Sequence, residues 1–301
     1  MGNPRRATAA LKRLIRPCLP IGALPLLSRR QLGRERKEEA EHRARFDSLR
    51  DSVSSAVFAI RSLTLQQCAD VAMLEHKLIP SLGLNDEILH EQPPELSPFF
   101  GRNLHIWQYP CQLAPYLVWL SENATSVTTY MEIGCRWGGM FVLVSEWLRK
   151  IGAELKCLCA MDAIEPSPFI EEYFKMLREE ASAGASAIEP LYLRALSTSD
   201  EARQVVERIR PDFVFIDGDH TLEGALSDHM LVRDNADIIV HHDVHSSVCP
   251  GTTQLWATLK RLERYEFEAV EFIAQYGSVP SNFLGIGALK RTAGWRRTTT
   301  F

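Results

Sequence analysis

The stretch VTTYMEIGCRWGGM, residues 127–140, decides the fold class of this chain. Its first seven residues form a short strand-like run that ends at Ile133, and a glycine-containing turn follows at once. The turn leads directly into an apolar helical pattern from Met140 to Arg149. A buried strand that passes through a glycine turn into a helix is the repeating unit of an α/β sheet.

The same alternation continues toward the C-terminus. Four further apolar runs predict strands at 156–161, 191–195, 213–216 and 238–240, and an amphipathic helical pattern separates each run from the next. Continuous apolar strands joined by helices form a parallel sheet that is covered on both faces. For the helix after residue 220 we predict a buried face made of Leu222, Ala225, Leu226 and Met230.

The last two apolar runs, 265–273 and 283–289, are separated by a loop around Gly277 and Pro280 and not by a helix. Two consecutive strands without a crossover helix pair antiparallel. We therefore predict a doubly wound, mostly parallel, seven-stranded α/β sheet with an N-terminal helical extension.

Two segments precede the sheet domain, which we place at 104–301. Residues 1–35 are basic, with no acidic residue before Arg34, and we expect a disordered tail there. An organellar transit peptide or a patch for an anionic partner is the alternative. Residues 36–103 read as a helical lead-in and loop: helices at 36–63 and 65–79, the second ending at Pro80, then a loop at 85–103.

Composition limits the class of protein. With 46% hydrophobic residues and a net charge of −4, the chain is typical of a soluble globular protein and unlike a generic nucleic-acid binder. No apolar run is long enough to span a bilayer. The seven cysteines include no Cys-x-x-Cys pair, which favours a reducing compartment. We expect a cytoplasmic protein, or an organellar one if the basic N-terminus is a transit peptide.

Ligands of open α/β sheets bind beyond the carboxyl ends of the strands, so the residues at those ends are candidates for a site. The first strand ends in a turn with Gly134 and Gly138, and the second ends at Asp162. An acid at that second position can accept hydrogen bonds from both hydroxyls of a ribose. A tight turn for the glycines and a helix N-cap for Asp162 are the structural alternatives.

The most informative ends are those of the fourth and fifth strands. The fourth runs into Asp217-Gly218-Asp219-His220, and the fifth into the segment 241–245, HHDVH. Burying so many ionisable groups for stability alone is costly, which favours a ligand site. Asp217, His242 and Asp243 offer oxygen and nitrogen ligands to a divalent metal. We expect His241 and His245 to be exposed polar ends of the strand.

With these strand ends identified, the region 104–289 resembles the class I S-adenosylmethionine-dependent methyltransferases. It is most similar to a branch of small-molecule O-methyltransferases that includes cephalosporin-hydroxylase-like and rhamnosyl O-methyltransferase-like proteins. The resemblance implies the strand order 3-2-1-4-5-7-6, S-adenosylmethionine as cofactor, and O-methylation of a small molecule or sugar. It is carried by Trp107-Gln108-Tyr109-Pro110, the turn Glu132-x-Gly134-x-x-x-Gly138, the segment 215–220 with Glu223-Gly224, and His242-Asp243.

The resemblance also implies roles for individual residues. Glu132 and Gly134 would line the methionine part of the cofactor, Asp162 the ribose and Ser197 the adenine. We count Gly138 and Asp217 among the cofactor-binding residues too. Asp217, His242 and Asp243 would hold a divalent metal, Mg²⁺ or Mn²⁺, and His220, with Asp219, would carry catalysis as the general base.

This sequence departs from the family pattern at two positions and leaves two other functions open. Arg136 stands where the common turn has its middle glycine, and His242 replaces a carboxylate, which weakens the case for Mg²⁺. A cofactor-binding or interaction module without catalysis therefore stays an alternative. An NAD(P)-dependent dehydrogenase is the other, although the chain lacks the G-x-G-x-x-G spacing.

Overall fold

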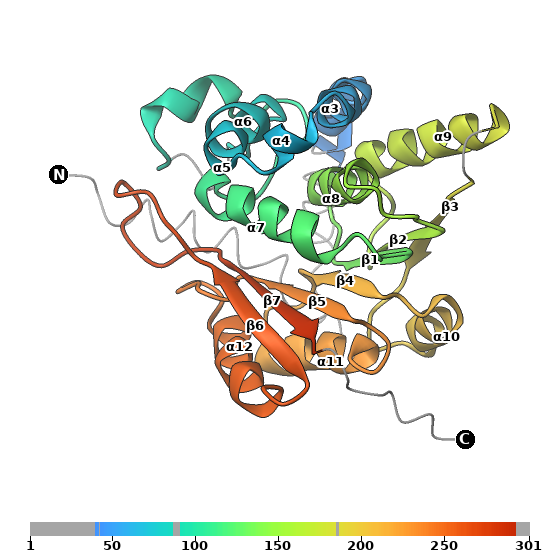
Figure 1. Cartoon of the computed structure of the whole chain (residues 1–301), viewed down its shortest axis with the longest axis vertical. Coiled ribbons are helices and arrows are strands. Elements are labelled where there is room, and N and C mark those ends of the chain that lie inside the picture. The colour runs from blue at the N-terminus through green and yellow to red at the C-terminus, as the bar shows by residue number, and fades with distance from the viewer. Residues whose placement is uncertain (1–39, 42, 87–90, 185–186, 293–301) are drawn as a thin grey trace, which may run out of the picture.

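A computed structural model describes residues 40–41, 43–86, 91–184 and 187–292 of the chain, and the basic tail predicted for 1–35 lies outside them. Seven strands form one sheet in the order β3-β2-β1-β4-β5-β7-β6, which confirms the predicted fold and strand order (Figure 1). The strands from β1 to β5 pair parallel, whereas β7 pairs antiparallel with both β5 and β6. The strands are β1 Thr129–Ile133, β2 Cys157–Asp162, β3 Glu189–Arg194, β4 Phe213–Ile216, β5 Ile238–His242, β6 Phe267–Phe272 and β7 Ile286–Arg291.

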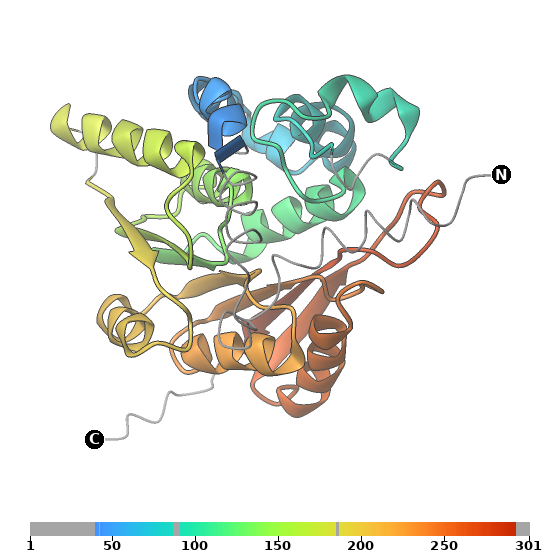
Figure 2. The same cartoon turned by 180° about the vertical axis from the view of Figure 1, so that it is seen from behind.

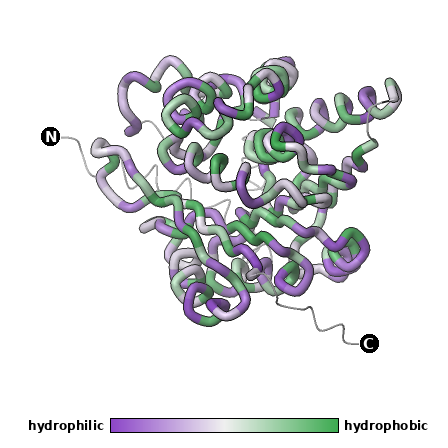
Figure 3. Tube along the Cα trace, in the orientation of Figure 1, coloured by the Kyte–Doolittle hydropathy of each residue, from purple (hydrophilic) through white to green (hydrophobic). Residues whose placement is uncertain are grey.

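Helices cover both faces of the sheet, as the views from front and back agree (Figures 1 and 2). One layer contains α7 Pro110–Asn123, α8 Gly139–Lys150 and α9 Pro168–Ser182. The other contains α10 Asp200–Ile209, α11 Leu222–Val232 and α12 Pro250–Leu262. Successive strand side chains point to opposite faces, so Tyr130 and Met131 enter separate hydrophobic cores. Hydrophobic residues accordingly concentrate along the central strands (Figure 3).

The N-terminal segment forms a further layer on α8 and α9. Its helix α3, Ser52–Arg61, buries Val53, Val57 and Ile60 as the predicted pattern requires. Arg61 reaches from α3 to the buried carboxylate of Glu146 on α8, at 2.6 Å. The segment 52–61 is therefore tied to the sheet domain by apolar packing and by a buried ion pair.

The predicted helices of this segment are broken into shorter pieces. A turn at residues 49–51 interrupts the predicted helix 36–63. The predicted helix 65–79 becomes α4 Leu65–Cys68, α5 Val71–Met73, a π-helical turn Leu74–Leu78 and α6 Ile79–Ser81. The break after α4 arises because Asp70 accepts the N–H of Met73 and so starts a new helix.

Pro80 does not end the helix because it occupies the first turn of α6, where no N–H is needed. The predicted loop 85–103 contains a 3₁₀ helix, Pro94–Phe99.

The predicted buried face of α11 is wrong in part. Leu226 is 42% exposed and Met230 is 57% exposed, whereas Asp228 and His229 are completely buried. Polar side chains can occupy the inner face when the fold supplies partners, and His229 Nδ1 lies 3.1 Å from Nε2 of His241. Ala225 is buried and Leu222 packs against the core as predicted, so the apolar pattern placed two of its four residues correctly.

Among the residues described, no helix combines the length and the apolar character that crossing a membrane would require.

Candidate active site

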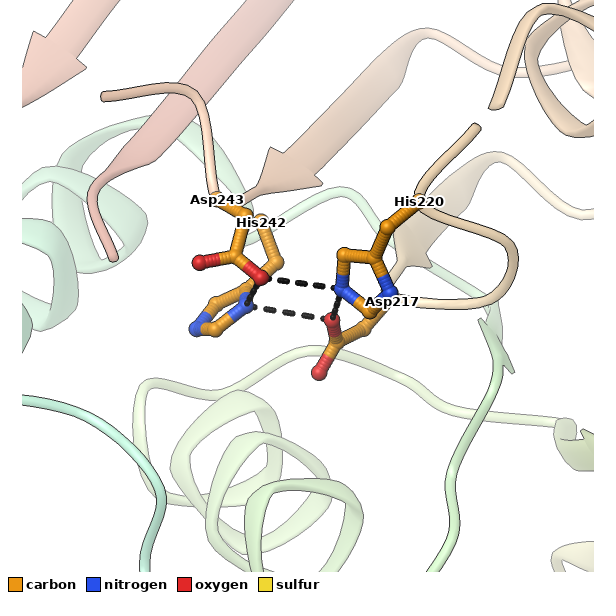
Figure 4. A group of neighbouring side chains, drawn as sticks. All are labelled: Asp217, His220, His242 and Asp243. Carbon is orange, nitrogen blue, oxygen red and sulfur yellow. Dashed lines mark ion pairs between the residues drawn. The ribbon is translucent and has the colours of Figure 1, made fainter. Parts of the chain in front are cut away.

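Four ionisable side chains converge at the carboxyl ends of β4 and β5 (Figure 4). Asp217 and His220 follow β4, while His242 ends β5 and Asp243 comes directly after it. The two strands are neighbours, with Ile216 paired to His241. One ligand atom from each of the four residues lies within 4.8 Å of the others. We refer to Asp217, His220, His242 and Asp243 as the carboxyl-end cluster.

Acids and imidazoles alternate within the carboxyl-end cluster. His220 Nε2 lies 2.9 Å from Asp243 Oδ2 and 3.3 Å from Asp217 Oδ1. His242 Nδ1 lies 3.1 Å from Asp217 Oδ1 and 3.6 Å from Asp243 Oδ2. His242 and Asp243 are buried, whereas Asp217 and His220 remain partly accessible. The cluster is thus closed on the β5 side and open on the β4 side.

Backbone geometry directs Asp243 into the cluster. Its φ of 57° lies in the left-handed region, which an aspartate tolerates better than most residues. The side-chain hydroxyls of Thr252 and Thr253 both donate to its carbonyl oxygen, at 2.9 and 3.3 Å. The start of α12 therefore holds the turn that follows β5.

The electrostatics of the cluster favour an additional positive charge. Burial by itself raises the pKa of Asp217 and Asp243, but His242 and His220 outweigh it and lower both pKa values. Burial disfavours the charged form of His242, but the two carboxylates prevail and raise its pKa to about 10. Among the described residues, Asp243 Oδ1 and His242 Nδ1 have no hydrogen-bond partner. Two acids and an unpartnered ring nitrogen make a donor set that fits a divalent cation.

Asp219 is not part of the cluster. Its Oδ1 accepts the N–H of Thr221 at 2.8 Å, which forms the turn that starts α11. A Cβ on Gly224 would lie 2.2 Å from Asp219 Cγ, so this carboxylate is packed against the helix. The position of Asp219 indicates a turn-forming residue and lends no support to the predicted catalytic role.

The turn after β1 adjoins the cluster through its backbone. Gly134 has a φ of 84°, and a Cβ there would lie 2.2 Å from the carbonyl oxygen of Asp217. Gly138 has a φ of 80° and packs on Ile170, whose Cδ1 would lie 2.5 Å from an added Cβ. Close packing therefore accounts for both glycines, and their predicted cofactor contacts stay predictions.

Glu132 at the end of β1 is a buried carboxyl group. Its Oε2 accepts the hydroxyl hydrogen of Tyr130 at 2.6 Å. Burial raises the pKa of Glu132 to about 8, and the nearby charge of Asp217 adds to this. No arginine or lysine that the structure describes forms an ion pair with Glu132, and the charge of nearby His242 offsets the effect of burial only in part.

Asp162 joins the end of β2 to the turn after β1. Its Oδ2 accepts the N–H of Arg136 at 2.7 Å, and its Oδ1 accepts the N–H of Ile164 at 3.2 Å. The helix N-cap is Ser167, which accepts the N–H of Ile170, so Asp162 does not serve as the cap. Both carboxylate oxygens are held by backbone donors and keep lone pairs for a ligand.

Arg136 lies in the turn after β1, and Ser197 lies in the loop after β3. The Arg136 guanidinium stacks on the indole rings of Trp107 and Trp137, at 5.1 and 5.5 Å from their centroids. Arg136 has a φ of 38°, a positive value of the kind that glycine usually adopts. Ser197 lies beside Asp228, whose pKa burial raises to about 6. No ligand contact of Ser197 follows from this, and its adenine role stays a prediction.

His241 is buried, which corrects the prediction of an exposed strand end. It is 4% exposed, because β5 continues through His242 and alternation turns His241 toward α11 and α12. Its Nε2 meets His229 Nδ1 at 3.1 Å, and burial together with His229 lowers its pKa below 6.5. His245 is half-buried.

Gln108 and Gln112 also belong to the site, although their sequence context did not predict this. Gln108 Oε1 lies 2.5 Å from His242 Nε2, and Gln108 Nε2 donates to Gln112 Oε1. The segment 107–110 of the sequence was the available signal, but the partner of a polar residue that precedes a helix cannot be assigned until the fold is known.

No protein-family model matches this sequence, and no curated protein matches it. Among solved structures, it is similar to an O-methyltransferase from Bacillus cereus in complex with SAH (17% identity, 60% of this chain and 79% of that chain, TM-score 0.37). It is also similar to a putative rRNA methylase from Clostridium thermocellum (11%, 60% and 97%, TM-score 0.42). A third is the O-methyltransferase TomG from Streptomyces achromogenes in complex with SAM (17%, 63% and 83%, TM-score 0.39). All three TM-scores lie below 0.5, so these likenesses add nothing to the description of the site.

Proposed function

We propose that the protein is a class I S-adenosylmethionine-dependent methyltransferase that methylates a hydroxyl group of a small molecule or sugar. The observation that carries this proposal is the contact between the turn after β1 and the carboxyl-end cluster. Gly134 leaves no room for a Cβ against the Asp217 carbonyl, so a cofactor bound along that turn would face the cluster. This edge lies where the strand order reverses between β1 and β4, the usual ligand site of such sheets.

The cofactor half of the site uses residues at the ends of β1 and β2. S-adenosylmethionine, when bound, supplies the methyl group. Asp162 is held by two backbone N–H groups and would accept the hydroxyl hydrogens of the ribose. Glu132, whose pKa is raised to about 8, would line the methionine part and would favour a positive charge there. Ser197 is assigned to the adenine end.

The reacting half consists of the carboxyl-end cluster. His220, at its open side, accepts the proton of the substrate hydroxyl, and Asp217 and Asp243 stabilise the resulting imidazolium. The same acids orient the imidazole, so the base is held before the substrate arrives. The net charge of −4 favours a small neutral or polar substrate over a nucleic acid.

The residues of the cluster also fit a divalent cation, Mg²⁺ or Mn²⁺. Neighbouring ligands around an ion with bonds of about 2.1 Å lie about 3.0 Å apart. The separations of His242 Nδ1 from Asp217 Oδ1 and Asp243 Oδ2, 3.1 and 3.6 Å, are close to this. Asp217, His242 and Asp243 would hold the ion. A bound cation supplies positive charge that makes a nearby hydroxyl more acidic.

Calorimetric titration with S-adenosylhomocysteine tests the cofactor assignment. We expect micromolar binding to the wild type and a loss of at least about tenfold in Asp162→Asn, about 1.4 kcal/mol, because a ribose contact is lost. Asp212→Asn is the matched control. Asp212 also accepts backbone N–H groups, those of Thr128 and Thr129, but at the opposite end of the strands. Binding of NADH without S-adenosylhomocysteine would refute the proposal.

A further inference from the structure

Two glutamines, Gln108 and Gln112, lie against the β5 side of the carboxyl-end cluster. Gln108 precedes α7, Gln112 lies in its first turn, and both are completely buried. A buried amide needs an acceptor for its NH₂ group and a donor for its oxygen. The partners of these two side chains therefore determine the orientation of each amide group, that is, the positions of its oxygen and its nitrogen.

The orientation of Gln112 is set by the backbone just before β7. The N–H of Gly285 donates to Gln112 Oε1 over 3.2 Å, and Gln112 Nε2 donates to the carbonyl oxygen of Phe283 over 3.4 Å. A backbone N–H can only donate and a backbone carbonyl can only accept. Reversing the Gln112 amide would place donor against donor and acceptor against acceptor.

The orientation of Gln108 follows from that of Gln112. Gln108 Nε2 donates to Gln112 Oε1, whereas the reversed amide would bring two carbonyl oxygens together. Gln108 Oε1 therefore faces His242 Nε2, at 2.5 Å. An amide oxygen can only accept a hydrogen bond, so Nε2 of His242 carries the hydrogen.

The other ring nitrogen of His242 faces the two acids. His242 Nδ1 lies 3.1 Å from Asp217 Oδ1 and forms no hydrogen bond with any residue in the described part of the chain. A cation that binds here displaces the proton from Nδ1, which leaves a neutral imidazole that is protonated at Nε2 and carries its lone pair on Nδ1. Two carboxylates and one nitrogen lone pair then converge on one point.

We propose that Gln112 and Gln108 form a relay of fixed polarity that holds His242 in the Nε2-protonated tautomer, so that Nδ1 binds a divalent metal and the site selects Mn²⁺ over Mg²⁺. The proposal rests on the proposed function for the need for a cation at the cluster. Gln108 and Gln112 act as positioning residues, since they contact the ligand His242 and not the ion. Hydrogen bonds of this kind to a metal-bound histidine fix its tautomer and ring orientation.

The donor set explains the expected selectivity. Mg²⁺ binds almost exclusively through oxygen, whereas imidazole nitrogen suits transition metals. His242 supplies a nitrogen ligand beside the two carboxylates, and the relay makes that nitrogen available. A donor set with one imidazole nitrogen therefore favours Mn²⁺ over Mg²⁺.

Calorimetry with MnCl₂ and MgCl₂ on the full chain tests the relay. We expect the wild type to bind Mn²⁺ at least about tenfold more tightly than Mg²⁺. Gln108→Leu and Gln112→Leu should each weaken Mn²⁺ binding by about ten- to a hundredfold. Gln275→Leu is the matched control, because Gln275 also donates to the Phe283 carbonyl, at 2.8 Å, but has no place in the relay. Equal affinity for the two ions, or unchanged Mn²⁺ binding in both relay variants, would overturn the proposal.

A direct measurement of the tautomer covers the case in which a relay variant does not fold. Long-range ¹H–¹⁵N correlation spectra of histidine-labelled wild type, loaded with diamagnetic Zn²⁺, should show His242 protonated at Nε2 and ligated at Nδ1. His242→Gln identifies its signals. Protonation at Nδ1 would overturn the proposal.

Parallel titration with S-adenosylhomocysteine separates this inference from the proposed function. Selective Mn²⁺ binding without S-adenosylhomocysteine binding would leave the relay standing and refute the methyltransferase assignment. Binding of S-adenosylhomocysteine without Mn²⁺ selectivity would overturn the relay and leave His220 as the base.

Discussion

Two clusters of buried charge in this protein are built from different residues. In one, the completely buried Glu146 receives hydrogen bonds from Arg61 at 2.6 and 3.0 Å, from Arg149 at 2.8 Å and from Tyr173 at 2.7 Å. In the other, Asp217 and Asp243 are paired with the imidazoles of His220 and His242. Glu146 and Asp243 are buried and Asp217 is partly accessible, but the main difference lies in the partners.

The type of partner determines whether a cluster of buried acids stabilises the fold or can take part in chemistry. Arginine is charged at every accessible pH and forms bidentate pairs, so the Glu146 cluster is neutralised once the chain has folded. Histidine is charged only when protonated, so the carboxyl-end cluster depends on protons or on a bound cation for its neutrality. A buried acid with arginine partners stabilises the fold, whereas acids with imidazole partners keep the capacity to exchange a charge.

The largest effect should follow from removing the base of the carboxyl-end cluster. His220→Ala should lower turnover by about two to four orders of magnitude, because proton transfer loses its positioned acceptor. Steady-state kinetics at saturating cofactor measure this. Affinity for S-adenosylhomocysteine should stay within about threefold, since His220 lies on the substrate side. A variant that keeps its turnover but loses stability would show that His220 belongs with Glu146 among structural residues.

A smaller effect, on stability and not on chemistry, should follow at the Glu146 cluster. Arg61→Leu removes the bidentate partner and leaves Glu146 with Arg149 and Tyr173. Breaking a buried pair costs about 3–5 kcal/mol, but Arg61 is 37% exposed, so we expect about 2 kcal/mol. Urea unfolding gives the value. Turnover per folded molecule should not change, and a loss of turnover would contradict the division between the clusters.

The smallest effect concerns Asp228, a buried acid that forms no ion pair with an arginine or histidine in the described part of the chain. Burial raises its pKa from 3.8 to about 6, so its folded state favours the neutral form. Its ionisation therefore costs no stability below pH 3.8, and the cost develops as pH rises through about 6. Asp228→Asn should raise the free energy of unfolding by about 1 kcal/mol at pH 8 and leave it unchanged at pH 3.5, since the amide never ionises. Urea unfolding at the two pH values tests this, and equal effects at both would contradict the raised pKa.

Much of the fold could be predicted because its signals are local. Short apolar runs between amphipathic patterns predicted the parallel strands, and the absence of a helix between 265–273 and 283–289 predicted the antiparallel pair. The errors at α11 and at the end of β5 occurred where polar residues are buried. His229 and His241 face the interior because each is the partner of the other, and hydropathy treats both as surface residues.

For the site, the sequence predicted which residues come together but not how each side chain is oriented. The acids and histidines after the fourth and fifth strands are brought together as expected, because neighbouring parallel strands end at one edge of a sheet. Asp219 shows the limit of that reasoning. It has the same residue type and nearly the same position as Asp217, but its carboxylate turns toward Thr221 and Gly224 instead.

The sequence by itself determined which strands form the sheet and which ionisable residues stand at their ends, because hydropathy and residue order are properties of the chain. Only the tertiary structure decided how those residues are oriented. The tautomer of His242 depends on Gln108, whose amide depends on Gln112, whose partner Gly285 lies 173 residues further along the chain. Hydrogen-bond polarity passes only between groups in contact, and folding alone brings these four into contact.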